Sequence, residues 1–125
     1  MKTVLNLSAS DWRKKVLESD VLTVVDFWHE HCPFCLRLNP LFEEIAIEYK
    51  DKIKFTKLNV LETKDNRKVA VKYGIMSTPT LLFFCEGRTV GQALGFMPKE
   101  KMKNTLDAIL ASHKECVKQS TPLET

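Results

Sequence analysis

Residues 21–35 read VLTVVDFWHEHCPFC, and this stretch decides the fold. Its first part, residues 21–27, is β-branched and almost continuously apolar, which is typical of a strand covered on both faces. Two cysteines, Cys32 and Cys35, follow at once and begin a helical pattern of apolar residues. A C-x-x-C that joins a strand to a helix N-terminus is typical of a dithiol redox site. We therefore expect the chemistry of the chain to reside in this cysteine pair.

The rest of the chain supplies further strands and helices in alternation. Apolar patterning and turn residues predict strands over residues 4–7, 53–60, 80–85 and 88–94, and helices after Ser8 or Ser10, after Cys35, over residues 67–73 and from Pro98 onward. Pro40 lies inside the helix that follows the cysteines, so we expect a kink or a broken hydrogen bond there. This order of elements favours an α/β sheet with helices on both faces.

Composition limits the classes of function. The chain has 125 residues, is 44% hydrophobic and has a formal net charge of +3. This length suits one domain, expected over residues 1–113, with a polar and frayed tail over residues 114–125. The lysines are spread along the chain, which argues against nucleic-acid binding, and the sequence has no apolar run long enough to cross a membrane. We see no signal peptide at the N-terminus, so we expect a cytoplasmic protein.

Several further motifs stand in register with the cysteine pair. They are Val25-Asp26-Phe27-Trp28, Pro40, Lys57, Tyr73-Gly74-Ile75, Thr78-Pro79-Thr80, Gly87 and Gly95. With Cys32 and Cys35, they make the chain resemble the thioredoxin family over roughly residues 3–112. The resemblance implies the thioredoxin fold, a central mixed β-sheet of four to five strands flanked by about four helices. It also implies thiol–disulfide exchange as the activity and a cis peptide bond before Pro79.

Thiol–disulfide exchange assigns different roles to the two cysteines. A thiolate attacks a disulfide, and a second thiol then resolves the mixed disulfide. Cys32 is the expected attacker, because the helix dipole and the free N–H groups of the first turn stabilise its negative charge. The more interior Cys35 is the expected resolving thiol. Pro33 has no N–H to lose in the first turn, and it stiffens the site.

Asp26 is the one charged residue in the apolar strand. Burial raises the pKa of a carboxyl, so Asp26 could take the proton of Cys35 during the second step, with Lys57 as its charge partner. The alternative is that Asp26 is only a satisfied polar group at the end of a strand. Pro79, if cis, exposes the backbone of Thr78 as a short edge for a substrate peptide; the alternative is an ordinary trans proline.

The active-site sequence departs from the usual family pattern. Thioredoxins usually carry Trp-Cys-Gly-Pro-Cys, whereas this chain reads His31-Cys32-Pro33-Phe34-Cys35. A proline directly after the first cysteine is closer to glutaredoxins and to periplasmic oxidases. A protonated His31 would stabilise the Cys32 thiolate and make the disulfide more oxidising. The physiological direction of exchange therefore stays open. Asn59, where many relatives have aspartate, weakens the expected acid–base network.

Other residues around the cysteines have two interpretations each. Trp28 is expected to wall the site, and Ile75-Met76 with Phe96-Met97 form either an apolar rim for client segments or ordinary packing. Phe34 and Gly95 complete the expected substrate-binding residues. His29, His31, Cys32 and Cys35 also resemble a metal-ligand set, although a redox dithiol is the preferred interpretation and we assign no metal. Cys85 is expected to be a passive thiol and Cys116 an exposed one.

The sequence thus predicts an enzyme, a thiol–disulfide oxidoreductase that reduces protein disulfides. The alternatives are an oxidase, isomerase or glutaredoxin-like activity on the same fold, or a binding module whose cysteines are incidental. The expected partners are disulfide-containing client proteins and a reductase or other thiol donor, and the chain is expected to be a monomer. No cofactor is expected, because the electrons reside in the Cys32–Cys35 disulfide itself.

Overall fold

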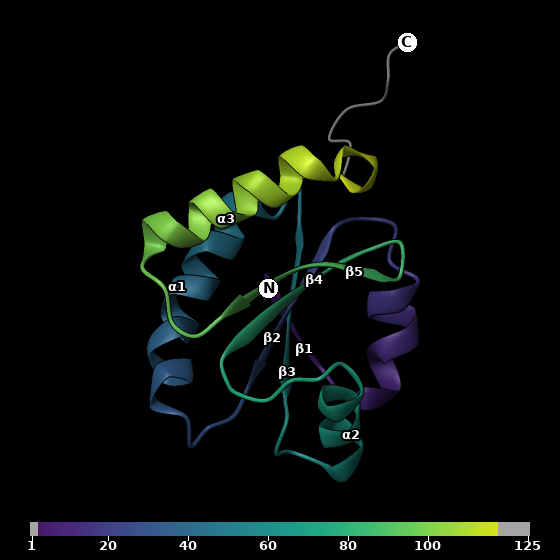
Figure 1. The fold of residues 1–125 in the computed structure, drawn as a ribbon, viewed down its shortest axis with the longest axis vertical. Coiled ribbons are helices and arrows are strands. Elements are labelled where there is room, and N and C mark those ends of the chain that lie inside the picture. The colour runs from purple at the N-terminus through teal and green to yellow at the C-terminus, as the bar shows by residue number, and fades with distance from the viewer. Residues whose placement is uncertain (1–2, 118–125) are drawn as a thin grey trace.

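A five-stranded sheet lies at the centre of the computed structural model, which describes residues 3–117 (Figure 1). Its strands, in the order in which they lie side by side, are β1 (Val4–Leu7), β3 (Lys54–Asn59), β2 (Thr23–Trp28), β4 (Thr80–Cys85) and β5 (Arg88–Leu94). β1 and β2 both run parallel to β3, whereas β4 is antiparallel to β2 and β5 is antiparallel to β4. The predicted mixed sheet is thereby confirmed. Because β2 and β4 run in opposite directions, the end of β2 lies beside the start of β4.

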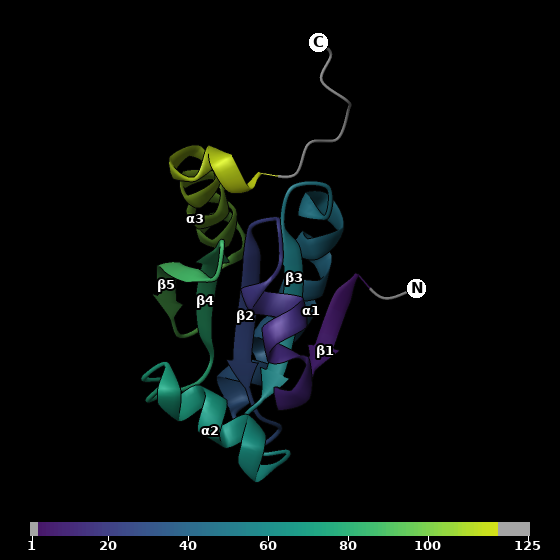
Figure 2. The ribbon, with the colours of Figure 1, turned by 90° about the vertical axis from the view of Figure 1, so that its right-hand side faces the viewer.

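Helices cover both faces of the sheet (Figures 1 and 2). One face carries α1 (Pro33–Tyr49) and α3 (Lys99–Ser112), and its core contains apolar side chains from both helices, including Leu38, Phe42 and Met102. The other face carries α2 (Lys64–Lys72), the short 3-10 turn η1 (Ala9–Asp11) and the π-helical turn η2 (Arg13–Leu17). Their core contains Trp12 and Ala70. This layering is the predicted α/β thioredoxin fold.

Helix α1 begins directly at the cysteine motif. Cys32 is its N-cap residue and Pro33 its first residue, a position where the missing N–H of proline costs no helix hydrogen bond. The helix continues past Pro40, and the expected break is limited to one hydrogen bond of the helix. Pro40 cannot donate to the carbonyl of Leu36 four residues earlier, but both residues are exposed, so water can reach that carbonyl.

The segment after α3 differs from the expected frayed tail. Residues Lys114–Cys116 form a 3-10 turn, η3, and the carbonyl of Cys116 accepts a hydrogen bond of 2.7 Å from the N–H of Leu22. Cys116 is buried and forms a disulfide with Cys85, the last residue of β4. The expectations of a passive Cys85 thiol and an exposed Cys116 are therefore wrong. Residues 118–125 of the expected tail lie outside the described part of the chain, and the domain limits stay a prediction.

The polar composition of residues 113–115 explains this error. A turn of 3-10 helix places its last residue on a different side from the residues before it, so one apolar side chain can point inward from a polar segment. The partner of Cys116 is 31 residues away in sequence, on a strand, and no local pattern links the two cysteines. Within residues 3–117, no helix combines the length and the apolar character that a membrane span requires.

Candidate active site

The two cysteines of the motif lie together at the N-terminus of α1. Cys32 has extended backbone torsions, and Cys35 follows within the first turn of the helix. The two side chains form a disulfide across a Cα–Cα distance of 5.2 Å. The N–H of Cys35 donates a hydrogen bond of 3.2 Å to Sγ of Cys32. When the pair is reduced, this N–H and the helix dipole both stabilise a thiolate on Cys32.

The accessibility of the two sulfurs differs in the direction that exchange requires. Cys32 retains 7% of its surface, whereas Cys35 retains none. An incoming disulfide must be contacted directly by the attacking sulfur, so Cys32 is the cysteine that it can reach. Cys35, in the first turn of the helix, can reach Cys32 but not solvent.

Thr78 and Pro79 lie against the attacking cysteine. The Thr78–Pro79 peptide bond is cis, which confirms the expected isomer. Sγ of Cys32 lies 3.4 Å from the carbonyl oxygen of Thr78. On the far side, the carbonyl of Pro79 accepts a hydrogen bond of 2.8 Å from the N–H of Gly95. Gly95 has a φ of +81°, a left-handed conformation that favours glycine and that turns the chain between β5 and α3 toward the site.

Asp26 is buried in the sheet beneath α1. It lies on the same face of β2 as Val24, which packs in the core under α1 and α3. Neither carboxyl oxygen has a hydrogen-bond partner within the described part of the chain. Burial raises the pKa of Asp26 to about 7, and the positive charge of Lys57 opposes that rise. A carboxyl with this pKa can both accept and release a proton near neutral pH.

Lys57 contacts the ring of Trp28 and stands opposite Asp26 in the sheet. In the register of β2 and β3, Lys57 stands opposite Asp26, and it is largely buried. Among residues 3–117 the two side chains form no ion pair within 4.0 Å. The Lys57 ammonium instead lies 4.3 Å from the centre of the Trp28 ring, a cation–π contact. Lys57 therefore acts on the carboxyl through space, while Trp28 covers the ammonium.

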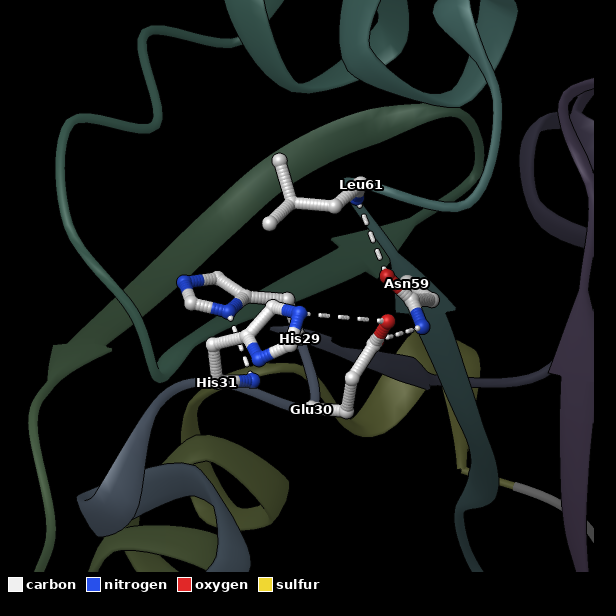
Figure 3. Close-up of polar contacts among 5 residues, drawn as sticks. All are labelled: His29, Glu30, His31, Asn59 and Leu61. Atoms are coloured by element: carbon white, nitrogen blue, oxygen red, sulfur yellow. Dashed lines mark hydrogen bonds and ion pairs between the residues drawn. The ribbon is translucent and has the colours of Figure 1, made fainter.

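A chain of polar contacts ties the loop before Cys32 to the end of β3 (Figure 3). His29 Nδ1 accepts from the N–H of His31 at 3.1 Å, and Glu30 Oε1 accepts from Asn59 Nδ2 at 2.8 Å. Asn59 Oδ1 in turn accepts from the N–H of Leu61 at 2.9 Å. The hydrogen bond from Asn59 is the main reason why the pKa of Glu30 lies below its usual range. Sequence reasoning missed this Glu30–Asn59 contact, since nothing local links residues 29 apart.

His31 itself is available to a partner. Its side chain is 76% exposed, and its Nε2 lies 3.8 Å from Glu30 Oε2. Across the described residues, no three of the side chains of His29, His31, Cys32 and Cys35 bring their ligand atoms within 4.8 Å of one another. The alternative interpretation of these residues as a metal set therefore has no support in the geometry.

Exposed apolar side chains occur in the cysteine motif and just before Thr78. Phe34 is 53% exposed and Met76 93% exposed. Met76 also lines a groove of about 320 Å³, together with residues that include His29, Leu61, Val71 and Thr78. Met97 is an exception to the expected rim, because it is buried in the core under α1 and α3. Arg37 bridges the other side of the motif, with its guanidinium 5.7 Å from the Phe34 ring and 5.1 Å from the Phe96 ring.

Comparison with known proteins agrees with this geometry. The family model for thioredoxin matches residues 3–108. The chain belongs to the thioredoxin family. It is 38% identical to thioredoxin 1 of Synechococcus elongatus and 39% identical to thioredoxin 1 of a Nostoc species, in each case over 86% of this chain and 97% of the relative. It is also 37% identical to the chloroplastic thioredoxin M4 of Arabidopsis thaliana, over 86% of this chain but only 54% of that longer protein.

The family resemblance drawn from the motifs is thus confirmed. The structure brings most of the predicted site residues to one end of the sheet, where β2 ends and β4 begins. Cys32, Cys35, Thr78, Pro79 and Gly95 are linked by the contacts given above. Trp28, Lys57 and Asp26 form a second group on the strands beneath them. Their individual roles, and those of Pro33, Phe34, His31 and Met76, remain predictions.

Proposed function

We propose that this chain reduces disulfide bonds in proteins through the Cys32–Cys35 pair. The observation that carries the proposal is the paired cysteines at the N-terminus of α1, with the accessible sulfur of Cys32 beside the Thr78 carbonyl. Membership of the thioredoxin family supports the same activity. The electrons reside in the two sulfurs, so the proposal needs no further cofactor.

The proposed cycle has two exchange steps. The Cys32 thiolate attacks one sulfur of a client disulfide, which forms a mixed disulfide and releases the other client sulfur as a thiolate. The Cys35 thiol then loses its proton to Asp26 and attacks Sγ of Cys32. The Cys32–Cys35 disulfide forms, the bond between Cys32 and the client breaks, and the two client thiolates take up one proton from Asp26 and one from water. The client has gained two electrons and the chain has lost two, so a reductase or another thiol donor must restore the reduced pair.

Client recognition is proposed to use backbone and apolar contacts together. The backbone at Thr78 offers a short edge to an extended client segment. Phe34, within the cysteine motif, and Met76, two residues before Thr78, present exposed apolar surface. The groove between Leu61 and Met76 can take an apolar client side chain. These contacts favour exposed, extended segments that carry a disulfide, not a small-molecule substrate.

The proposal also includes the direction of exchange, which is reduction of the client. We place the chain among reductants, in a cytoplasmic setting and as a monomer. The Pro33-Phe34 dipeptide and the exposed His31 are the features that would instead favour oxidation, since an imidazolium beside Cys32 stabilises its thiolate. Oxidase, isomerase or glutaredoxin-like activity is therefore the second candidate.

A redox titration decides between these directions. The protein is equilibrated with dithiol–disulfide buffers, alkylated, digested and measured by mass spectrometry, so that the two cysteine pairs are followed separately. A midpoint for Cys32–Cys35 near −270 mV, roughly that of a reductant, supports the proposal. A midpoint of about −200 to −120 mV supports the oxidising alternatives. The absence of a reversible two-electron transition would leave a binding module.

Two variants test the order of attack. Cys32→Ser removes the attacking thiol, and reduction of an insulin disulfide should fall to background. Cys35→Ser removes the resolving thiol, and mixed disulfides with client proteins should accumulate. The double variant Cys85→Ser/Cys116→Ser is the matched control, because it removes the other cysteine pair and should retain turnover. Trapping by Cys32→Ser in place of Cys35→Ser would reverse the assignment.

A further inference from the structure

Four potential metal ligands gather at the end of the sheet away from Cys32. Cys85 is the last residue of β4, His113 immediately precedes η3, and Glu115 and Cys116 lie within that turn. Cys85 Sγ lies 3.6 Å from Glu115 Oε2, and that oxygen lies 3.8 Å from His113 Nδ1. These three atoms all lie within 4.8 Å of one another. Cys116 is next in sequence to Glu115 and is bonded to Cys85.

These separations match the edges of a tetrahedral zinc site. Zinc binds cysteine sulfur at about 2.3 Å, histidine nitrogen at about 2.0–2.1 Å and carboxylate oxygen at about 2.0–2.2 Å. In a tetrahedron with such bonds, neighbouring ligand atoms are roughly 3.3–3.8 Å apart. The sulfur–oxygen and oxygen–nitrogen distances here are already of that size. Two of the three separations among these atoms are therefore those of a zinc site, and the third is below 4.8 Å.

The disulfide determines whether the two cysteine ligands are available. Zinc binds cysteine as the thiolate, so the Cys85–Cys116 disulfide offers no such ligand. A dithiol reductant transfers two electrons to the Cys85–Cys116 disulfide and becomes a disulfide itself. Cys85 and Cys116 are then both thiols. The Cα atoms of Cys85 and Cys116 are 5.8 Å apart, close enough for both sulfurs to reach one ion. Zinc binding would then release the two thiol protons.

We propose that the reduced form of this cluster binds one zinc ion through Cys85, His113, Glu115 and Cys116, and that the disulfide form does not. The cysteine pair at the end of β4 is then a redox-gated metal site.

Backbone hydrogen bonds hold the cluster in place, and its ligands are only partly exposed. The carbonyl of Cys116 accepts from the N–H of Leu22 at 2.7 Å, and the N–H of Cys116 donates to the carbonyl of His113 at 3.0 Å. These bonds fix the turn against the start of β2 without using any ligand atom. The two cysteines are buried, whereas the side chains of His113 and Glu115 are 24% and 51% exposed. The sulfurs are thus shielded, and an ion can enter from the side of the histidine and the carboxylate.

The test uses the full chain with Cys32→Ser and Cys35→Ser, so that the other cysteine pair cannot bind metal. This background also lacks the proposed reductase activity, so the two proposals fail or succeed separately. The reduced protein is titrated with cobalt(II), and zinc is then measured by competition with a chromophoric chelator. We expect a thiolate-to-cobalt charge-transfer band, the strong d–d bands of a tetrahedral ion, and one zinc per chain. The oxidised protein should show neither band nor zinc.

Variants identify the ligands. In the same background, Cys85→Ser or Cys116→Ser should weaken the charge-transfer band, because only one thiolate remains to bind the ion, and His113→Ala should weaken zinc binding at least tenfold. His29→Ala is the matched control and should leave zinc binding unchanged. If a cysteine variant does not fold by circular dichroism, the comparison of reduced and oxidised parent protein still decides. No zinc in the reduced protein, or equal zinc in both redox states, would overturn the proposal.

Discussion

Replacing Asp26 with asparagine should make the protein more stable, and the gain should grow with pH. The carboxyl has a pKa of about 7 in the folded chain and an ordinary value of 3.8. At 1.36 kcal/mol per pKa unit, this difference corresponds to about 4 kcal/mol. The cause is burial without a hydrogen-bond partner for either oxygen, which penalises the ionised form.

The direction in which stability changes with pH depends on whether the folded or the unfolded chain holds the proton of Asp26 more tightly. Below pH 3.8 the carboxyl is neutral in both the folded and the unfolded chain, so its titration costs no stability. Between pH 3.8 and about 7 the unfolded chain ionises while the folded chain keeps the proton, and the free energy of unfolding falls as the pH rises. Above about 7 both states are ionised and the full cost of about 4 kcal/mol remains. An asparagine at this position has no such dependence.

The assay is urea unfolding of the oxidised protein at a series of pH values between about 4 and 8. The difference in unfolding free energy between Asp26→Asn and the parent should rise across this range by about 4 kcal/mol. A constant offset from burying an amide does not affect that rise. Asp51→Asn, at an exposed turn, is the control and should show no comparable change. A difference that stays flat with pH would refute the assignment of a buried, unpaired carboxyl.

Four other experiments test further features of the structure. Lys57→Met should raise the pKa of Asp26 above about 7, because the charge of Lys57 lowers it; an NMR titration of the carboxyl checks this, and an unchanged pKa would contradict it. Gly87→Ala should lower the free energy of unfolding by about 2 kcal/mol, since its φ is +79° and the new methyl would lie 3.1 Å from a backbone carbonyl of η2. Gly74→Ala, with a φ of +70° and open space, should cost only about 1 kcal/mol, and equal losses would mean that the close approach is unimportant. Tyr49 should ionise at a pKa of about 12 in an ultraviolet titration, because burial and the hydrogen bond to an aspartate of α3 disfavour the phenolate; ionisation near 10 would show that this contact is absent.

Much of the fold could be predicted because its signals are local. The apolar run of residues 21–27 and the C-x-x-C that follows are contiguous in sequence, so strand, helix start and cysteine pair were predicted together. The limits of the elements were less accurate. Helix α2 begins at Lys64, earlier than predicted, because the Thr63 side chain accepts from the N–H of Asn66 and caps the first turn. That cap lies in a polar segment without the apolar periodicity on which the prediction depended.

The parts of the site that depend on distant pairs could not be predicted in this way. The sequence identified Asp26 and Lys57 as polar residues on apolar strands, but not that Trp28 would cover the lysine. Burial of Met97 follows from how α3 packs on the sheet, which no single segment specifies. The Cys85–Cys116 disulfide is the clearest case. The local sequence indicates a passive thiol at Cys85 and an exposed thiol at Cys116, and only the fold brings the ends of β4 and η3 together.

Strand β4 separates the two cysteine pairs by its whole length. Cys32 lies against Thr78, just before the strand begins, and Cys85 is its last residue. Six residues of extended chain span about 20 Å, far more than the contact distance that sulfur exchange demands. One molecule therefore cannot pass electrons from its own Cys32–Cys35 dithiol to its own Cys85–Cys116 disulfide. If the protein reduces that disulfide, it does so in another copy of itself, and the initial rate rises with the square of the protein concentration.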